Sequence, residues 1–202
     1  SSAASDVYKR QIFWWEWAHR FLGRLIGICF LLPLIYFSLK VKTSKLINLY
    51  LIFVLICFQG FLGWYMVKSG LIDRVDVSHF RLSMHLLIAF IILSLIFWNY
   101  LKINIDNNIP YKMNSSIPLI FLVLVFLQII IGAFVSGMDA GKIYNSWPLM
   151  GSTFFPNDNS LNSLFKFTAF SEPSLVQFMH RNLAYLILGV YLITLYIIIT
   201  NK

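Results

Sequence analysis

Three histidines lie within runs of hydrophobic residues, where an imidazole is costly enough to indicate a function. They are His19, His85 and His180. A small residue follows each of them by four positions, on the same face of a helix. These small residues are Gly23, Ala89 and Ala184. A small residue one turn from an imidazole leaves a flat space beside the ring. Such a space favours a porphyrin, because haem iron takes one or two axial histidines from facing helices.

Charged residues accompany the histidines. Arg20 and Arg181 each follow a histidine directly, and Arg81 precedes His85 by four residues. Guanidinium groups bind carboxylates in a bidentate manner, so these arginines are candidate partners for the two haem propionates. Glu16 shares a helix face with His19, and a carboxyl buried beside a ligand is a candidate proton acceptor.

Simpler interpretations of the same residues stay open. Glu16 could form only an ion pair with Arg20 at the membrane edge. Each histidine could serve a hydrogen bond between helices, and the small residues could permit close helix packing. Zinc is a poorer fit than haem, because it requires more ligands close together, with cysteine or carboxylate among them.

Five hydrophobic segments, each long enough to cross a bilayer, position these residues. They are 13–39, 46–67, 80–101, 117–136 and 175–200. The chain is 59% hydrophobic and only 12% charged, which excludes a soluble enzyme, a disordered tail and a nucleic-acid module. Two cysteines exclude a disulfide framework or a zinc cage. Because spanning segments in lipid must be helices, the sequence predicts an all-α, polytopic membrane protein.

Lysines in the short loops predict the orientation. Lys40, Lys42 and Lys45 crowd one short loop, and Lys102 and Lys112 flank another. The positive-inside rule places these loops in the cytoplasm, or in the matrix of a mitochondrion. The three histidines then begin helices that enter from the opposite side, at similar depth. We therefore expect sites facing the periplasm across a bacterial inner membrane, or the intermembrane space across a mitochondrial one.

Weak internal similarity indicates a duplicated fold. Residues 15–20 resemble 176–181, and a Gln-x-x-x-Gly pattern occurs at both 59–63 and 128–132. A duplicated four-helix bundle would have eight helices. We predict a non-native or disordered leader at 1–11, an N-terminal half at 12–114 with three helices, and an incomplete C-terminal half at 115–202 with two. The ending directly after a span favours a truncated chain.

Four stretches together resemble a known family. They are Trp-Trp-Glu-Trp-Ala-His-Arg at 14–20, Arg-Leu-Ser-Met-His-Leu at 81–86, the loop at 137–150, and Gln-Phe-Met-His-Arg-Asn-Leu-Ala-Tyr at 177–185. They are similar to haem A synthase, in its mitochondrial and alphaproteobacterial branch. The other branch has a cysteine pair in an outer loop, whereas Cys29 and Cys57 both lie within predicted helices.

The resemblance implies an activity and a set of roles. Members oxidise a methyl group of haem O to a formyl group, which yields haem A for cytochrome oxidase. It implies that His19 and His85 hold the substrate haem, that Glu16 is the essential glutamate, and that His180 ligates a haem b cofactor. The outer loop at 144–150 would cover a haem edge. The implied partners are the bilayer, a haem O synthase that supplies the substrate, and the assembly of cytochrome oxidase.

Two other classes remain as alternatives. A cytochrome-b-type electron carrier is the first, although such proteins pair histidines in both leaflets, whereas these three histidines lie near one face. A structural assembly subunit or transporter without haem is the second. The sequence leaves open the electron donor, the oligomeric state (a homo-oligomer included), the organism, the second haem b ligand, and whether this chain folds or acts alone.

Overall fold

Five long helices make up most of the structure. The computed structural model describes residues 2–70, 77–104, 114 and 116–200. The helices are α1 (Ser2–Lys40), α2 (Ile47–Gly70), α3 (His79–Asn104), α4 (Ser116–Gly137) and α5 (Pro173–Thr200). The described residues form no β-strand, only an isolated bridge between Met150 and Thr153. The prediction of an all-α fold is confirmed.

All five helices are long and apolar enough to cross a membrane. The spans are Phe13–Lys40, Ile47–Lys68, His79–Ile103, Ser116–Gly137 and Pro173–Thr200. No end departs from its predicted position by more than two residues. Helix α1 begins at Ser2, so residues 2–11, which we set apart as a leader, continue the first helix. The duplicated eight-helix architecture and the division into two halves stay predictions.

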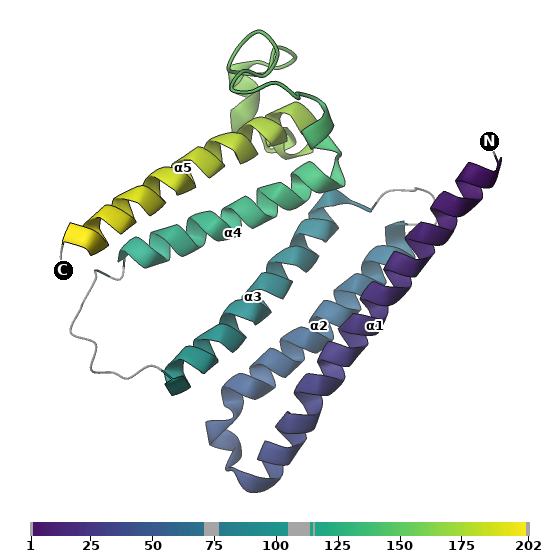
Figure 1. The fold of residues 1–202 in the computed structure, drawn as a ribbon, viewed down its shortest axis with the longest axis vertical. Helices are drawn as coiled ribbons and strands as arrows, with labels where there is room; N and C mark the ends of the chain where they lie inside the picture. Colours follow the sequence, from purple (N-terminus) through teal and green to yellow (C-terminus); the bar gives the residue numbers. More distant parts are fainter. Residues whose placement is uncertain (1, 71–76, 105–113, 115, 201–202) are drawn as a thin grey trace.

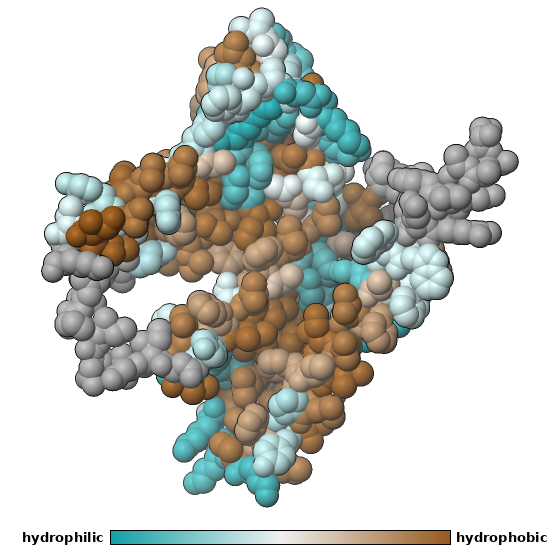
Figure 2. Space-filling model, viewed as in Figure 1, coloured by the Kyte–Doolittle hydropathy of each residue, from teal (hydrophilic) through white to brown (hydrophobic). Residues whose placement is uncertain are grey.

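The surface of the helices is hydrophobic. The accessible area is 14874 Å², against about 9,800 Å² expected for a soluble monomer of this mass. At most 11% of the most apolar window of any span is buried within the protein. Figure 2 shows hydrophobic residues over the helices and hydrophilic residues gathered toward the top and the bottom. Such a surface suits a membrane protein whose helices face lipid.

Each spanning helix packs mainly against its neighbours in the chain. In Figure 1 the α1–α2 pair and the α4–α5 pair lie on either side of α3, at an angle to one another. A 3₁₀ turn, η1 (Thr43–Lys45), joins α1 to α2. Between α4 and α5, residues 138–172 contain η2 (Ala140–Lys142), η3 (Leu161–Phe165) and η4 (Phe167–Ser171). This segment, which we call the outer loop after the side that the sequence predicts for it, packs over the start of α5.

Proline and glycine shape the ends of these helices. Pro173 occupies the first position of α5, where its missing N–H costs nothing. Gly137, the last residue of α4, lies against the first residue of α3. A Cβ added at Gly137 would lie 2.9 Å from both Cα and Cβ of His79. The close approach of α4 to α3 at this end therefore requires glycine.

Replacing Gly137 by alanine should destabilise the fold, because the nearest atom is backbone and cannot move aside alone. We expect Gly137→Ala to lower the free energy of unfolding by about 1–3 kcal/mol, the usual cost of overpacking. Thermal unfolding in detergent measures this. Gly189→Ala on α5 is the control, because no neighbouring atom lies within 4 Å of its added Cβ. Equal unfolding temperatures for the two variants would contradict the prediction.

Candidate functional site

His19 on α1 and His85 on α3 face one another. Their ring centroids are 6.3 Å apart, and the ring planes are inclined by 62°. The two residues are separated by 66 positions in the sequence and by the whole of α2. His19 is exposed on the outer surface of the bundle, whereas His85 is half-buried. Of the three histidines predicted to bind haem, these are the two whose rings the structure brings into contact.

His180 lies in a different environment, against α4. The side-chain amide of Gln128 donates to the backbone carbonyl of His180 over 3.3 Å, and its nitrogen is also 3.3 Å from His180 Nε2. The Nδ1 atom of His180 is buried and has no hydrogen-bond partner among the described residues. His180 therefore has one ring nitrogen near an amide and one buried nitrogen unpaired.

His85 has a similar partner on α2. The side-chain amide of Gln59 donates to the backbone carbonyl of His85 over 2.9 Å. The His85 Nδ1 atom is also buried, and among the described residues it has no hydrogen-bond partner. Two histidines on different helices thus share one pattern, a glutamine on the preceding helix and an unpaired ring nitrogen.

Glu16 forms an ion pair with Arg20, one turn along α1. The side chains are 39% and 49% exposed respectively, so neither charge is buried within the protein. The guanidinium of Arg81 stacks over the ring of Tyr65, 5.0 Å from its centroid. Arg81 lies near the start of α3, whereas Glu16 and Arg20 lie within α1, on either side of His19 in the sequence.

Arg181 has a structural role that the sequence did not indicate. Its guanidinium donates to the carbonyl oxygens of Ser146, over 2.9 Å, and Tyr144, over 2.6 Å. Gln177, one turn earlier on α5, is only 5% exposed and also binds Tyr144. Its Oε1 accepts from the backbone N–H over 3.3 Å, and its Nε2 donates to the carbonyl over 2.9 Å. Both side chains fasten the outer loop to the start of α5.

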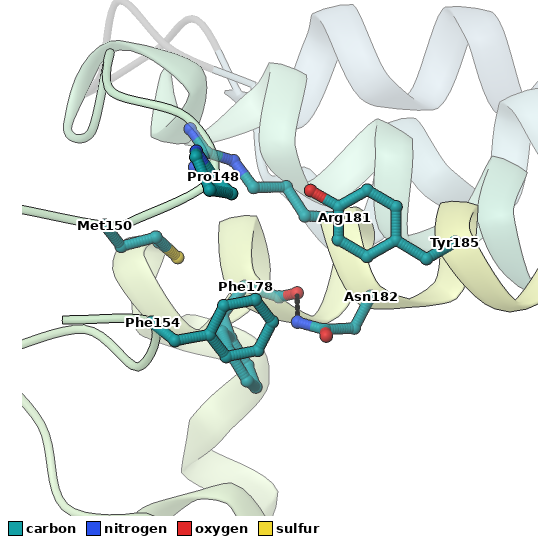
Figure 3. Close-up of a pocket in the computed structure, with 7 residues that line it drawn as sticks. All are labelled: Pro148, Met150, Phe154, Phe178, Arg181, Asn182 and Tyr185. Carbon is teal, nitrogen blue, oxygen red and sulfur yellow. Dashed lines mark hydrogen bonds between the residues drawn. The ribbon is translucent and has the colours of Figure 1, made fainter.

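Figure 3 shows how the outer loop meets α5. Pro148, Met150 and Phe154 of the loop line a small depression together with four residues of α5. Those four are Phe178, Arg181, Asn182 and Tyr185. Met150 is almost fully buried, and Trp147 Nε1 donates to the Tyr185 hydroxyl over 2.7 Å. The loop is thus packed on the helix that carries His180.

A hydrogen bond between Tyr144 and Asp158 closes the loop on itself. The Tyr144 hydroxyl donates to Asp158 Oδ1 over 3.1 Å. Burial raises the pKa of the Tyr144 phenol, and the nearby carboxylate of Asp158 raises it further. Burial alone would raise the pKa of Asp158, but hydrogen bonds from the hydroxyls of Ser174 and Tyr144 outweigh it and lower this pKa. Asp158 is therefore an ionised acceptor at neutral pH.

Of the small residues predicted beside the histidines, Gly23 does not lie against His19. No neighbouring atom lies within 4 Å of a Cβ added at Gly23, and Ala89 and Ala184 are half-buried on α3 and α5. Glycines of the preceding helices lie against the other two rings. These are Gly63 beside His85 and Gly132 beside His180. Both glycines end the repeated Gln-x-x-x-Gly pattern, which the sequence analysis interpreted only as a sign of duplication.

The described residues hold no cluster of three or more His, Cys, Asp or Glu side chains that would suit a metal ion alone. A zinc cage is therefore not found in this part of the chain. Two facing imidazoles, by contrast, are the number of protein ligands that an iron already held by a porphyrin needs.

Comparison with known proteins gives the family. A family model described as cytochrome oxidase assembly protein matches residues 4–202, nearly the whole chain. The chain belongs to this family. The match begins within segment 1–11 and continues through all five spans of this cytochrome oxidase assembly family member.

Curated relatives carry the name haem A synthase. One from Pelagibacter ubique is 51% identical over 179 residues, covering 88% of this chain and 53% of the relative. Relatives from Rickettsia bellii and Flavobacterium psychrophilum are each 46% identical, cover 86% and 88% of this chain, and are themselves 54% covered. The chain thus spans about half the length of these relatives. No solved structure matches it. The resemblance to the haem A synthase family that the sequence motifs indicate is confirmed, and its branch stays a prediction.

Removal of the Arg181 guanidinium should loosen the outer loop. Arg181→Met keeps most of the aliphatic stem but loses both hydrogen bonds to the loop carbonyls, so we expect severalfold faster proteolytic cleavage within residues 138–172. Lys166→Met removes an exposed charge from the same loop and is the control. A cleavage rate unchanged in Arg181→Met would show that the loop is held without this residue.

Proposed function

We propose that this protein is a haem A synthase, a membrane oxidoreductase that converts a methyl group of haem O to the formyl group of haem A. The observation that carries the proposal is the pairing of His19 with His85 across two helices. The name shared by the relatives supports it, as does the membership of the cytochrome oxidase assembly family.

The dimensions of the histidine pair fit a haem. Two imidazoles that each bind one metal ion through a bond of about 2 Å have ring centroids at most roughly 6 Å apart. The observed separation is 6.3 Å. The buried Nδ1 of His85 adds to the fit, because it has no hydrogen-bond partner among the described residues. This half-buried ring lies beside the exposed ring of His19.

The substrate haem would lie between α1 and α3 in this proposal. His19 and His85 would bind its iron. Conversion of the methyl group through an alcohol to the aldehyde is a four-electron oxidation, which also requires an oxygen-atom source such as water or dioxygen and an external redox partner. Glu16 lies on the face of α1 that carries His19, so its carboxylate would accept or relay the protons that oxidation releases. Arg20 is the present ion-pair partner of this carboxylate.

His180 would hold a second haem, a haem b that serves as cofactor. Bound there, haem b would supply electron transfer to the reaction. The buried Nδ1 of His180 and the glycine beside its ring fit a ligand-binding imidazole. Arg81 and Arg181 are the proposed partners of propionate groups, and for Arg181 this role would compete with its bonds to the outer loop.

Substitutions at Glu16 and His180 should separate the two sites. With the protein expressed at its native length and supplied with haem O, we expect Glu16→Ala to abolish haem A formation while the haem spectrum stays unchanged. His180→Ala should instead remove the haem b absorbance. Glu172→Ala, an exposed carboxylate of the outer loop, is the control for Glu16.

Either site assignment fails on a simple result. Haem A formation at the normal rate by Glu16→Ala would refute the proton-transfer role. An unchanged haem b spectrum in His180→Ala would refute the cofactor site. Haem binding without any conversion of haem O by the unmodified protein would favour the electron carrier, and the absence of a Soret band would favour a protein without haem.

We further propose that the histidines lie toward the periplasmic or intermembrane side, in a bacterial or mitochondrial inner membrane. A thiol-labelling experiment tests this orientation after Cys29 and Cys57 are replaced by alanine. A reagent that cannot cross membranes should label Phe165→Cys in intact cells, because Phe165 is 90% exposed in the outer loop. It should label Lys42→Cys only after the membrane is opened. The reverse pattern would invert the orientation.

A further inference from the structure

The Gln-x-x-x-Gly pattern of the sequence forms the same structure twice. On α2 it is Gln59 and Gly63, and on α4 it is Gln128 and Gly132. In each case the next helix in the chain carries a histidine that contacts both residues of the pattern. We call each such arrangement of glutamine, glycine and histidine a histidine seat. The first seat holds His85, and the second holds His180.

Each glycine makes room for one imidazole. A Cβ added at Gly63 would lie 3.2 Å from His85 Cε1, and a Cβ added at Gly132 would lie 3.1 Å from His180 Cε1. In both cases the other two nearest atoms belong to the same imidazole. A Cβ added at Gly60, on the same helix as Gly63, would have no neighbouring atom within 4 Å. The histidine rings therefore pack against Gly63 and Gly132, where a larger residue would contact them.

Each glutamine fixes the backbone of the histidine that it faces. The amide nitrogen donates to the carbonyl of the histidine residue itself, over 2.9 Å in the first seat and 3.3 Å in the second. This bond crosses between helices where lipid offers no competing partner, so it sets the rotation and height of one helix relative to the other. The glutamine and the glycine thus restrain the backbone and the ring of the same residue.

The two seats also leave the same atoms unpaired. The Oε1 atoms of Gln59 and Gln128 and the Nδ1 atoms of His85 and His180 are buried without a hydrogen-bond partner among the described residues. Chance contacts between helices would not repeat the same donor, the same clearance and the same unpaired atoms. Ligands of a metal centre commonly depend on such outer residues for their orientation.

We propose that Gln59 and Gly63, and likewise Gln128 and Gly132, are positioning residues that set the place and orientation of His85 and His180 for axial binding of haem iron. The inference rests on the proposed function for the iron, but the seating of the imidazoles does not. His19 has a different environment, because none of the glycines whose surroundings the structure describes lies against it. Each of the two proposed haem sites therefore has one histidine that is held in a seat, His85 in the first site and His180 in the second.

The first test needs no haem. The chain in lipid nanodiscs is treated with diethyl pyrocarbonate, and the modification rate of each histidine is followed by mass spectrometry. Gly63→Ala should push the ring of His85 away from α2 and raise its rate severalfold, with His180 unchanged. Gly132→Ala should raise the modification rate of His180, with that of His85 unchanged. Gly60→Ala and Gly189→Ala are the controls and should change neither rate. Equal rates in Gly63→Ala and Gly60→Ala would overturn the proposal.

The second test uses the protein at its native length with haem bound. Gly63→Ala should shift the reduction potential and low-spin spectrum of the haem bound by His85, and Gly132→Ala those of the other haem. If Gly63→Ala prevents folding, Gln59→Met is the substitute variant. It keeps the side-chain length but loses the hydrogen-bond donor, so it should also shift the potential of the haem bound by His85. If Gly60→Ala shifted the reduction potential as much as Gly63→Ala does, the positioning role would be refuted. Changed histidine rates in a protein that binds no haem would support the seats and refute the proposed function.

Discussion

Hydrogen bonds between the spanning helices join every neighbouring pair and act together with close packing, because lipid provides neither a hydrogen-bond partner nor a hydrophobic force between helices. Each neighbouring pair has such a bond. Ser38 and Tyr50 join α1 to α2 over 2.7 Å, and Ser83 donates to the carbonyl of Ile130, from α3 to α4, over 3.4 Å. The two glutamines of the histidine seats join the remaining pairs. The seats are thus part of the packing as well as of the proposed site.

Much of the fold was accessible from the sequence. The length and hydropathy of a spanning segment are local properties, so five helices and their ends were predicted closely. The candidate histidines could also be identified from the sequence, because a histidine within a hydrophobic run is rare enough to be informative. The predicted orientation puts His19 and His85 at the same depth, and the contact between their rings agrees with that depth.

Contacts between helices were harder to predict from the sequence. The sequence predicts small residues beside the histidines on the same helix, four positions on, but it does not show that Gly63 and Gly132 of the preceding helices lie against two of the rings. Helical periodicity says which residues share a face but not which face of another helix it meets. Arg181 shows the same limit, since the carbonyls that it binds lie more than thirty residues away in a loop without a periodic pattern.

The packing of each helix on its chain neighbours also bears on how the protein is assembled. Contacts between segments that follow one another in the chain form quickly, because little loop entropy is lost in bringing them together. The seat of His180 needs only α4 and α5, and the seat of His85 needs only α2 and α3. Both are complete once two consecutive helices have entered the membrane. The pairing of His19 with His85 joins α1 to α3, so it forms only after a third helix has been inserted.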